Sequence, residues 1–509
     1  QTCALPICAR SQMKMVGVRE YYLSAQIEHV AMGNPLKGAP GAHGGKRRCL
    51  HPAVRCLKLA RTGTTGAMNH TKRARSGHCR ILHSVWTRNV PEQPTVTDPR
   101  RRNHGDPSPV KRLRVGVVYG GRSSEHEVSL ASAASVIANL DRARYEPIAL
   151  RVERNGQWHL AERAPTIASA AENIESARLG NAHESRSTRQ VHLVAYPSDE
   201  TLLTVECSQA PGPEPNPVGQ TITKGLALDV IFPIVHGPYG EDGTLQGLLE
   251  LANVPYVGAG VLASAVGMDK AVMKVLFAAH GLPVVKHQVV WRRDWRAVPD
   301  RTLSEVTKRL RFPLFVKPAN LGSSVGISRA IDHETLSDAI DLASLFDRKI
   351  VIEEGVTPCR EIECAVLGNQ SPKASVPGEI IPSGEYYDYA AKYLDDQSTT
   401  EIPASLSADQ ATRIRQLAIE AFQAIDGEGM ARVDFLLESN TGTLFVNEIN
   451  THPGFTTISM FAKLWEASGV SYTAMLDRLI TLALERHAEK QDTLTSAPHT
   501  TEHEHATDG

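Results

Sequence analysis

One stretch near the C-terminal end of the chain constrains the fold most strongly, because it combines a strand pattern with several charged groups. Residues 431–454 read ARVDFLLESNTGTLFVNEINTHPG. Apolar and polar residues alternate along the first half, which is the period of a half-buried strand. Residues 440–442, Asn-Thr-Gly, are typical of a turn, and a second apolar run follows. The stretch is therefore predicted to form a β-hairpin.

Oxygen-bearing side chains would lie together on one face of this hairpin. Asp434 lies on the first predicted strand, and Glu448 and Asn450 lie on the second. Two carboxylates and an amide suit Mg²⁺, which binds a few protein oxygens together with phosphate. Arg432 would lie beside them and face an anion held by the metal. A surface hairpin with scattered charge is the alternative interpretation.

Composition limits the class of protein. The 509 residues predict two to four domains. The net charge of −1 hides an asymmetry, because residues 1–110 carry 18 Lys and Arg but only 5 Asp and Glu. Beyond residue 110 the thiols are Cys207, Cys359 and Cys364, which indicates a reducing compartment without a disulfide framework. No run of about 18 apolar residues occurs, so no membrane span is expected.

Residues 1–110 show no sustained helical or strand period and are rich in Gly, Arg, His and Thr. Residues 1–7, QTCALPI, resemble the translation of a sequencing-adapter oligonucleotide. We therefore expect residues 1–110 to be a disordered or non-native extension, and residues 486–509 to be a disordered polar tail. A basic arm that binds nucleic acid is the alternative for the first segment.

Two strand-to-helix junctions carry candidate ligand contacts. A strand at 113–118, a Gly-rich turn and a helix at 128–140 form the opening of an α/β unit, with Glu125 at the turn. A strand at 228–235 runs into His236 and a Gly- and acid-rich loop before another helix. A tight structural loop, capped by Asp242, is the alternative there. Residues 160–225 are predicted to be a loosely ordered insertion that has at most one hairpin.

A third region could close over a phosphate. Residues 313–318 read as a strand that carries Lys317, and a small-residue loop with Ser323 and Ser324 follows. Backbone N–H groups of such a loop and a lysine ammonium suit phosphate. An edge-strand lysine that prevents aggregation is the alternative role. Residues 383–393 are Gly-led, aromatic and polar, which is typical of an active-site lid.

The motifs in order resemble those of one family. They are Gly-Gly-Arg-Ser-Ser-Glu-His-Glu-Val-Ser, His-Gly-x-x-Gly-Glu-Asp-Gly, Met-Asp-Lys, Val-Lys-Pro-x-x-x-Gly-Ser-Ser-Val-Gly, Tyr-Asp-Tyr-x-x-Lys-Tyr, Ala-Arg-Val-Asp and Asn-Glu-Ile-Asn-Thr-x-Pro-Gly. Over roughly residues 112–485 the chain is similar to D-alanine–D-alanine ligases, which are ATP-grasp enzymes of peptidoglycan precursor synthesis. Each motif alone is moderate evidence, whereas seven in order are specific.

The resemblance implies an α/β (α+β) fold, a cytoplasmic location and a homodimer. The expected fold has an N-terminal Rossmann-like parallel α/β domain followed by a two-subdomain ATP-grasp fold. The implied divisions are 111–267 for the N-terminal domain, 268–355 for the central subdomain, and 356–485 for the C-terminal subdomain with the metal site and lid.

The resemblance also implies how ATP and metal bind. Asp434, Glu448 and Asn450 would hold two Mg²⁺ ions, with Mn²⁺ as a substitute. Glu353 and Val356 would contact the adenine and ribose through backbone groups, and Glu361 would do so through its carboxylate. Five further residues would hold the phosphates or form the loop over them: Lys270, Lys317, Lys392, Ser323 and Ser324.

Finally, the resemblance implies the reaction and its residues. One D-alanine would be phosphorylated on its carboxylate, and the amine of a second D-alanine would displace the phosphate. Arg432 and the N–H of Gly454 would stabilise the tetrahedral intermediate. Further roles concern the substrates and the lid: Glu125 and His236 for the first D-alanine, Ser459 and Met460 in a helix expected from residue 455 for the second, and Glu125, Ser323 and Tyr393 for closure.

Alternatives remain within this resemblance. A tyrosine at Tyr393 goes with D-alanine as second substrate in the family. A D-alanine–D-lactate or other D-amino-acid ligase is the alternative enzyme. An inactive ATP-grasp domain used as a binding module is the alternative that involves no catalysis.

Overall fold

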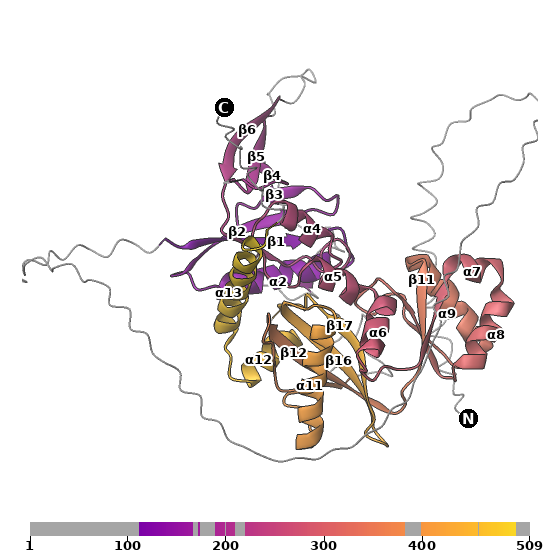
Figure 1. Cartoon of the computed structure of the whole chain (residues 1–509). Coiled ribbons are helices and arrows are strands. Elements are labelled where there is room, and N and C mark those ends of the chain that lie inside the picture. The colour runs from indigo at the N-terminus through magenta and orange to yellow at the C-terminus, as the bar shows by residue number, and fades with distance from the viewer. Residues whose placement is uncertain are drawn as a thin grey trace, which may run out of the picture. The chain divides into compact units, whose positions relative to one another are not determined.

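The computed structural model describes residues 111–165, 172–173, 189–198, 200–208, 219–381, 399–456 and 458–494. These all belong to the compact unit Arg101–Gly509. The predictions for residues 1–110 and for the end of the tail therefore lie outside the described residues. The described elements form three β-sheets with helices packed against them (Figure 1).

The first sheet has seven strands in the order β6-β5-β4-β3-β2-β1-β7. Only β1 pairs in parallel, with β2 on one side and β7 on the other. The other pairings are antiparallel, so the sheet is mixed, not parallel as expected. A short turn at Gly156 joins β2 to β3, and such a connection permits only antiparallel pairing. The strands are β1 (Leu113–Gly120), β2 (Tyr145–Val152), β3 (Trp158–Leu160), β4 (Arg189–Leu193), β5 (Leu202–Ser208), β6 (Gly219–Leu226) and β7 (Val230–Pro233).

The segment expected to be a loose insertion contributes three of these strands. β4, β5 and β6 pair with their neighbours as an antiparallel extension of the sheet. The sequence did not predict these strands for two reasons. The connections between them are rich in Ala, Ser and Pro, and a strand on the outer part of a sheet needs few apolar residues. The helices next to this sheet in sequence are α2 (His126–Asn139), α4 (Thr244–Leu251) and α5 (Val261–Met268).

The second sheet is small and wholly antiparallel, in the order β10-β9-β11-β8. Its strands are β8 (His287–Trp291), β9 (Leu314–Pro318), β10 (Ser328–Ala330) and β11 (Lys349–Glu354). The accompanying helices are α6 (Lys270–Ala279), α7 (Arg292–Ala297), α8 (Pro299–Arg309) and α9 (His333–Phe346). Asp269 caps α6, because its carboxylate accepts from the N–H groups of Ala271 and Val272.

The third sheet contains the predicted hairpin. Its order is β15-β14-β12-β16-β17, and β13 pairs with β12. The alternation predicted for β16 is confirmed, since Val433, Phe435 and Leu437 are all buried. The strands are β12 (Cys359–Gly368), β13 (Lys373–Ala374), β14 (Gly378–Ile381), β15 (Thr399–Glu401), β16 (Gly429–Glu438) and β17 (Leu444–Asn450), and the helices are α11 (Ala408–Ala424), α12 (Met460–Ala467) and α13 (Tyr472–Gln491).

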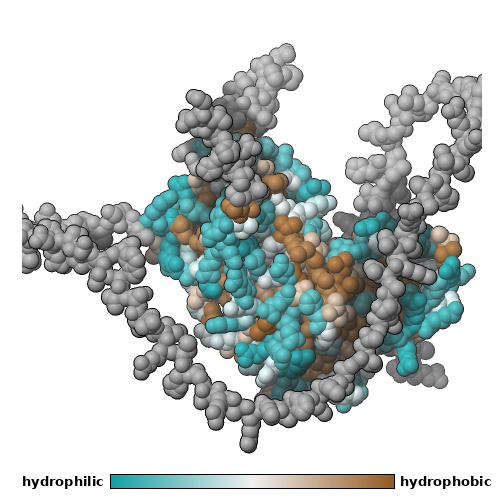
Figure 2. Space-filling view, in the orientation of Figure 1, coloured by the Kyte–Doolittle hydropathy of each residue, from teal (hydrophilic) through white to brown (hydrophobic). Residues whose placement is uncertain are grey.

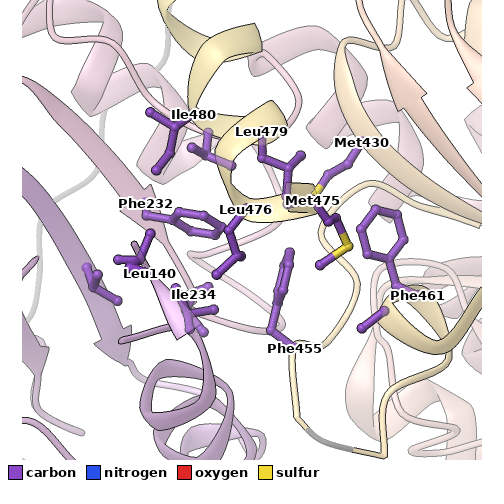
Figure 3. Close-up of a cluster of buried hydrophobic side chains, with 14 of the residues drawn as sticks. Leu140, Phe232, Ile234, Met430, Phe455, Phe461, Met475, Leu476, Leu479 and Ile480 are labelled. Atoms are coloured by element: carbon purple, nitrogen blue, oxygen red, sulfur yellow. The ribbon is translucent and has the colours of Figure 1, made fainter. Parts of the chain in front are cut away.

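Helix α13 joins the C-terminal part of the chain to the first sheet. Its apolar side chains pack with Phe232 of β7 and with Phe455, as Figure 3 shows. The expectation of a disordered tail from residue 486 is wrong for residues 486–491. Arg486 holds this end, because it donates to the carbonyl of Tyr256 at 2.8 Å and stacks on the Tyr256 ring. Among the described residues, no helix has the length and apolar content needed to cross a membrane.

Candidate active site

A row of charged side chains crosses the third sheet. In the strand register Glu363 faces Asp434, and Asp434 faces Glu448. Arg432 faces Asn450 one step along the same pair of strands. Like charges directly opposite each other destabilise a sheet, so this row requires cations nearby. The structure therefore brings the predicted metal ligands together on neighbouring strands.

Arg432 supplies one of these cations. Its Nε and Nη2 atoms donate to the two carboxylate oxygens of Asp434, both at 2.7 Å. Its Nε also lies 3.1 Å from Oε2 of Glu363. Burial lowers the pKa of Arg432, but the Asp434 and Glu363 carboxylates outweigh this effect and raise it well above its ordinary value. A permanently charged guanidinium is thus fixed at the centre of the row.

Lys270 supplies a second cation. Its Nζ atom lies 3.3 Å from Glu448 and donates to the carbonyl of Leu321 at 2.9 Å. Leu321 belongs to the small-residue loop, in which Ser323 and Ser324 both have a left-handed backbone, with φ of 52° and 56°. This conformation is uncommon for residues other than glycine and often marks ligand-binding loops. One lysine therefore links this loop to the acidic row.

Lys317 lies deeper, where β9 and β11 pair. Its Nζ atom is 2.8 Å from Oε2 of Glu353 and donates to Oδ1 of Asn447 at 3.4 Å. Glu353 is only 2% exposed, and its carboxylate also meets the Lys274 ammonium at 2.9 Å. The two ammonium groups outweigh the effect of burial and lower the pKa of Glu353 to about 2.

Glu125 and His236 form one end of the site. The hydroxyl of Ser323 donates to Glu125, which joins the loop to the start of α2. His236 is hydrogen-bonded to Glu241 and to Ser132, both at 3.1 Å. Burial lowers the pKa of His236, but the Glu241 carboxylate, helped by Glu125, raises it above its ordinary value.

Gly454 and the start of α12 form the other end. The helix begins at Met460, not at residue 455 as expected, and Ser459 is its N-cap residue. Oγ of Ser459 accepts from the N–H of Thr456 at 2.9 Å. A Cβ atom at Gly454 would lie 3.0 Å from that same oxygen. The N-terminal N–H groups of α12 are thus positioned to meet an anion.

A cavity of about 170 Å³ connects these parts. Residues predicted as site residues form a large share of its lining: Glu125, His236, Lys270, Ser323, Arg432, Glu448, Asn450, Gly454, Ser459 and Met460. Asp434 lies behind this wall and contacts it through its ion pair with Arg432, whereas Lys317 and Glu353 pair with each other and do not line the cavity.

Several predicted residues lie elsewhere. Val356 follows the end of β11 and is half-buried, and Glu361 lies on β12, half-buried, two residues before Glu363. Ser324 lies in the loop beside Ser323 without lining the cavity. Tyr393 and Lys392 are outside the described residues.

Two residues of the site were not predicted from the sequence, although the spacing of each from a predicted site residue places it on the same face. Glu363 lies two positions after Glu361 on one strand, so both side chains point to the same face. Lys274 lies four positions after Lys270, one helical turn further along the same face of α6. Both became recognisable only when the facing strands were known.

The proposed metal ligands fit the ion in donor type and register. In the part of the chain that the structure describes, no three or more His, Cys, Asp and Glu side chains are grouped to hold a metal ion. The predicted set instead has two carboxylates and one amide, and the carboxylates of Asp434 and Glu448 face each other across β16 and β17. Such a set leaves coordination positions for phosphate oxygens, as Mg²⁺ sites commonly do.

The second and third sheets are both antiparallel and carry paired cationic and carboxylate side chains beside a cavity that the small-residue loop also lines. This arrangement defines an ATP-grasp enzyme. The model of the D-ala D-ala ligase N-terminus matches residues 114–259, and that of the C-terminus matches residues 276–481. The chain belongs to the D-alanine–D-alanine ligase family.

Individual relatives agree with this assignment. A D-alanine–D-alanine ligase of Heliobacterium modesticaldum is 47% identical over 381 residues, which cover 75% of this chain and 97% of the relative. One of Bacillus velezensis is 46% identical over 374 residues, covering 74% and 98%. Among solved structures, the D-alanine-D-alanine ligase of Coxiella burnetii has a TM-score of 0.60 at 36% identity, covering 75% and 97%. The VanG D-Ala:D-Ser ligase of Enterococcus faecalis has a TM-score of 0.61 at 31% identity, covering 73% and 100%.

Proposed function

We propose that this chain joins two D-alanine molecules into D-alanyl-D-alanine, with ATP converted to ADP and phosphate, as a step of peptidoglycan precursor synthesis. The observation that carries the proposal is the cavity. It combines a carboxylate at Glu125, a fixed guanidinium at Arg432 and a helix N-terminus at Met460. These are the groups that an amino acid, a phosphorylated carboxylate and a second carboxylate would require.

ATP lies, in this proposal, between the second and third sheets. Lys270 and Lys317 contact its phosphates, as does Lys392 from the lid loop, and Ser323 and Ser324 cover them with backbone N–H groups. Glu353 and Val356 contact the adenine and ribose through their backbone. Glu361 holds the ribose through its carboxylate. The role of the Glu353 backbone is compatible with its carboxylate being held by two lysines.

Mg²⁺ or Mn²⁺ is held by Asp434, Glu448 and Asn450, and when bound it neutralises the charge on the transferring phosphate. Asp434 is itself paired with Arg432, so the Asp434 carboxylate would serve both this arginine and the metal. Glu363, 3.1 Å from Nε of Arg432, keeps the guanidinium in position.

The first step forms D-alanyl phosphate. A carboxylate oxygen of the first D-alanine attacks the γ-phosphorus of ATP, and the bond to the bridging oxygen of ADP breaks. Glu125, to which Ser323 donates, holds the ammonium of this D-alanine, and His236 lies beside it. Tyr393 would link with Ser323 and Glu125 to close the lid. Lys317 and Arg432 stabilise the charge that spreads over the phosphoryl group.

The second step forms the peptide bond. The amine of the second D-alanine, after loss of one proton from its ammonium, attacks the carbonyl carbon of D-alanyl phosphate. Arg432 and the N–H of Gly454 hold the resulting oxyanion. The C–O bond to phosphate then breaks, phosphate leaves, and the nitrogen loses its second proton. Ser459 and the N–H of Met460 bind the carboxylate of the second D-alanine.

The test is an assay of purified protein with D-alanine, ATP and Mg²⁺. We expect phosphate release together with formation of a dipeptide, and neither product above background for Asp434→Ala. Absence of phosphate release above that variant would overturn the proposal. A protein that binds ATP without turnover would instead support an inactive binding module, which the complete set of cations and carboxylates argues against.

The second substrate has one specific competitor. A solved structure similar to this chain bears the name D-Ala:D-Ser ligase, so D-serine is tested beside D-lactate against D-alanine. D-Lactate brings no ammonium that must lose a proton. The rate with D-lactate relative to the rate with D-alanine should therefore rise as the pH falls. Preference for D-alanine throughout the neutral range is the expected result.

The proposal extends to organisation and location. The domain divisions are those implied by the family resemblance, at 111–267, 268–355 and 356–485. The enzyme acts in the cytoplasm, where ATP is available and Cys359 and Cys364 stay free. It forms a homodimer through the N-terminal domain, and brown surface gathers over α4 and α5 in Figure 2, where Leu251 and Leu262 are exposed. Sedimentation of the chain from residue 111 tests this, and a monomer at micromolar concentration would exclude it.

A further inference from the structure

Lys274 is a buried ammonium that does not line the cavity. It is 1% exposed and lies on α6, one turn after Lys270. Its Nζ atom is 2.9 Å from Oε1 of Glu353 and donates to the carbonyl of Asn447 at 2.9 Å. It thereby connects α6 with a strand of the second sheet and a strand of the third.

Glu353 is shared between two lysines. Lys274 contacts one carboxylate oxygen, and Lys317 contacts the other at 2.8 Å. A buried carboxylate that loses one partner must rely wholly on the other, because an unpaired ion in the protein interior is strongly destabilising. With Lys274 present, Glu353 stays neutralised even while Lys317 turns part of its charge to another anion.

The charges around the two lysines agree with these separate roles, in which Lys274 neutralises Glu353 and Lys317 contacts another anion. Burial lowers the pKa of Lys274, although Glu353 opposes that change. For Lys317, the nearby Glu353 and Glu448 carboxylates outweigh burial and raise the pKa. Both lysines contact Asn447, one at its carbonyl and the other at its side-chain amide oxygen. The same residue of β17 therefore fixes their separation.

We propose that Lys274 is a positioning residue for ATP, because it neutralises Glu353 and so leaves Lys317 available to the phosphates. This inference rests on the proposed function, in which Lys317 binds those phosphates. It assigns Lys274 no contact with substrate. Its effect is therefore expected on nucleotides that carry phosphates and not on the nucleoside alone.

The experiment compares ADP and adenosine binding to full-length wild type and Lys274→Met, by calorimetry and by competition. Methionine keeps the length of the side chain and removes its charge. ADP binding should weaken about tenfold or more, equivalent to about 1.4 kcal/mol, while adenosine binding stays within about twofold. The matched control is Lys286→Met, which removes an exposed lysine that pairs with Glu354 at 3.3 Å. Both ligands should bind this control as they bind wild type.

A second variant separates charge neutralisation from packing. In Lys274→Met with Glu353→Gln, no buried carboxylate competes for Lys317, so ADP binding should return to within about threefold of wild type. This variant also serves if the single one fails to fold, because the buried Glu353 carboxylate, which Lys274→Met leaves with one lysine, is replaced by a neutral amide.

Each result decides the inference. Selective loss of ADP binding with rescue by Glu353→Gln supports it. Equal weakening of ADP and adenosine, or a double variant that still binds ADP poorly, overturns it and leaves the proposed function intact. Wild type that binds no ADP overturns both.

Discussion

Arg432 and Asp434 lie two residues apart on one face of β16 and are joined by two hydrogen bonds of 2.7 Å. Paired donors and acceptors of this kind fix a guanidinium in orientation as well as position. Because Glu363 on the neighbouring strand β12 also lies 3.1 Å from Nε of Arg432, the arginine is held between two acids. The sheet therefore fixes the orientation of the Arg432 guanidinium as well as the position of its charge.

Arg432→Lys should therefore be nearly inactive. A lysine keeps the charge but cannot reproduce the paired donors or aim one at an oxyanion. We expect kcat to fall by about 10²–10³, which is typical for loss of one oxyanion donor. The measurement is the rate of phosphate release with D-alanine at saturating ATP. Arg415→Lys is the control, since Arg415 donates to the carbonyl of Ala374 on the outer part of the same sheet. Retention of more than about a third of kcat in Arg432→Lys would contradict the role.

Glu363→Gln tests whether a second acid is needed to hold the arginine. The amide keeps the size of the side chain but weakens the 3.1 Å contact with Nε of Arg432. Arg432 would then depend on Asp434 alone, in competition with the metal. We expect the Mg²⁺ concentration for half-maximal activity to rise and kcat to fall by about tenfold, the value of one hydrogen bond to a charged group.

Binding of Mn²⁺ to the protein without substrates gives a readout for Glu363→Gln that does not depend on turnover. It should weaken in the variant. Glu420→Gln, on the exposed side of α11, is the comparison and should change nothing. Unaltered Mn²⁺ binding together with unaltered kcat in Glu363→Gln would show that Asp434 suffices.

The sequence predicts the hairpin at β16 and β17 well, because its signals are local. Alternation places Asp434, Glu448 and Asn450 on one face before any tertiary contact is known. The mixed pairing of the first sheet is not local, since β3 and β4 are separated by nearly thirty residues of polar sequence. Hydrophobic pattern alone could not order those strands.

Burial accounts for the other differences between the predictions from the sequence and the structure. Lys274 looks like an ordinary helical lysine until β11 and β17 cover it. Likewise the last turn of α13 is polar and is held by Arg486, whose partners are backbone carbonyls of a distant loop. Contacts to backbone carbonyls leave no trace in the sequence of the partner, so the sequence predicted a disordered tail there.

Gly237→Ala should displace Glu125. Gly237 has φ of 75°, and a Cβ atom there would lie 2.7 Å from Oε2 of Glu125. A left-handed alanine costs about 1–2 kcal/mol in addition to this clash. We expect KM for D-alanine to rise about tenfold or more, while KM for ATP changes little. Gly247→Ala is the control, because nothing lies within 4 Å of its Cβ position and α4 should gain stability. Equal changes in both KM values for Gly237→Ala would indicate a general distortion.

His452 should make the fold sensitive to acid. Burial, with a contribution from His236, lowers its pKa from the ordinary 6.5 to about 4. The folded protein therefore favours the neutral ring, so its contribution to stability is complete above about pH 6.5 and is lost as the pH falls towards 4. A shift of this size corresponds to about 3 kcal/mol. His452→Gln keeps a donor for the carbonyl of Pro233 but cannot be protonated. Urea unfolding from pH 7 to 4 should therefore show wild type losing more free energy of unfolding than the variant. Parallel pH profiles for the two proteins would mean that the ring gains a proton without cost in the folded state.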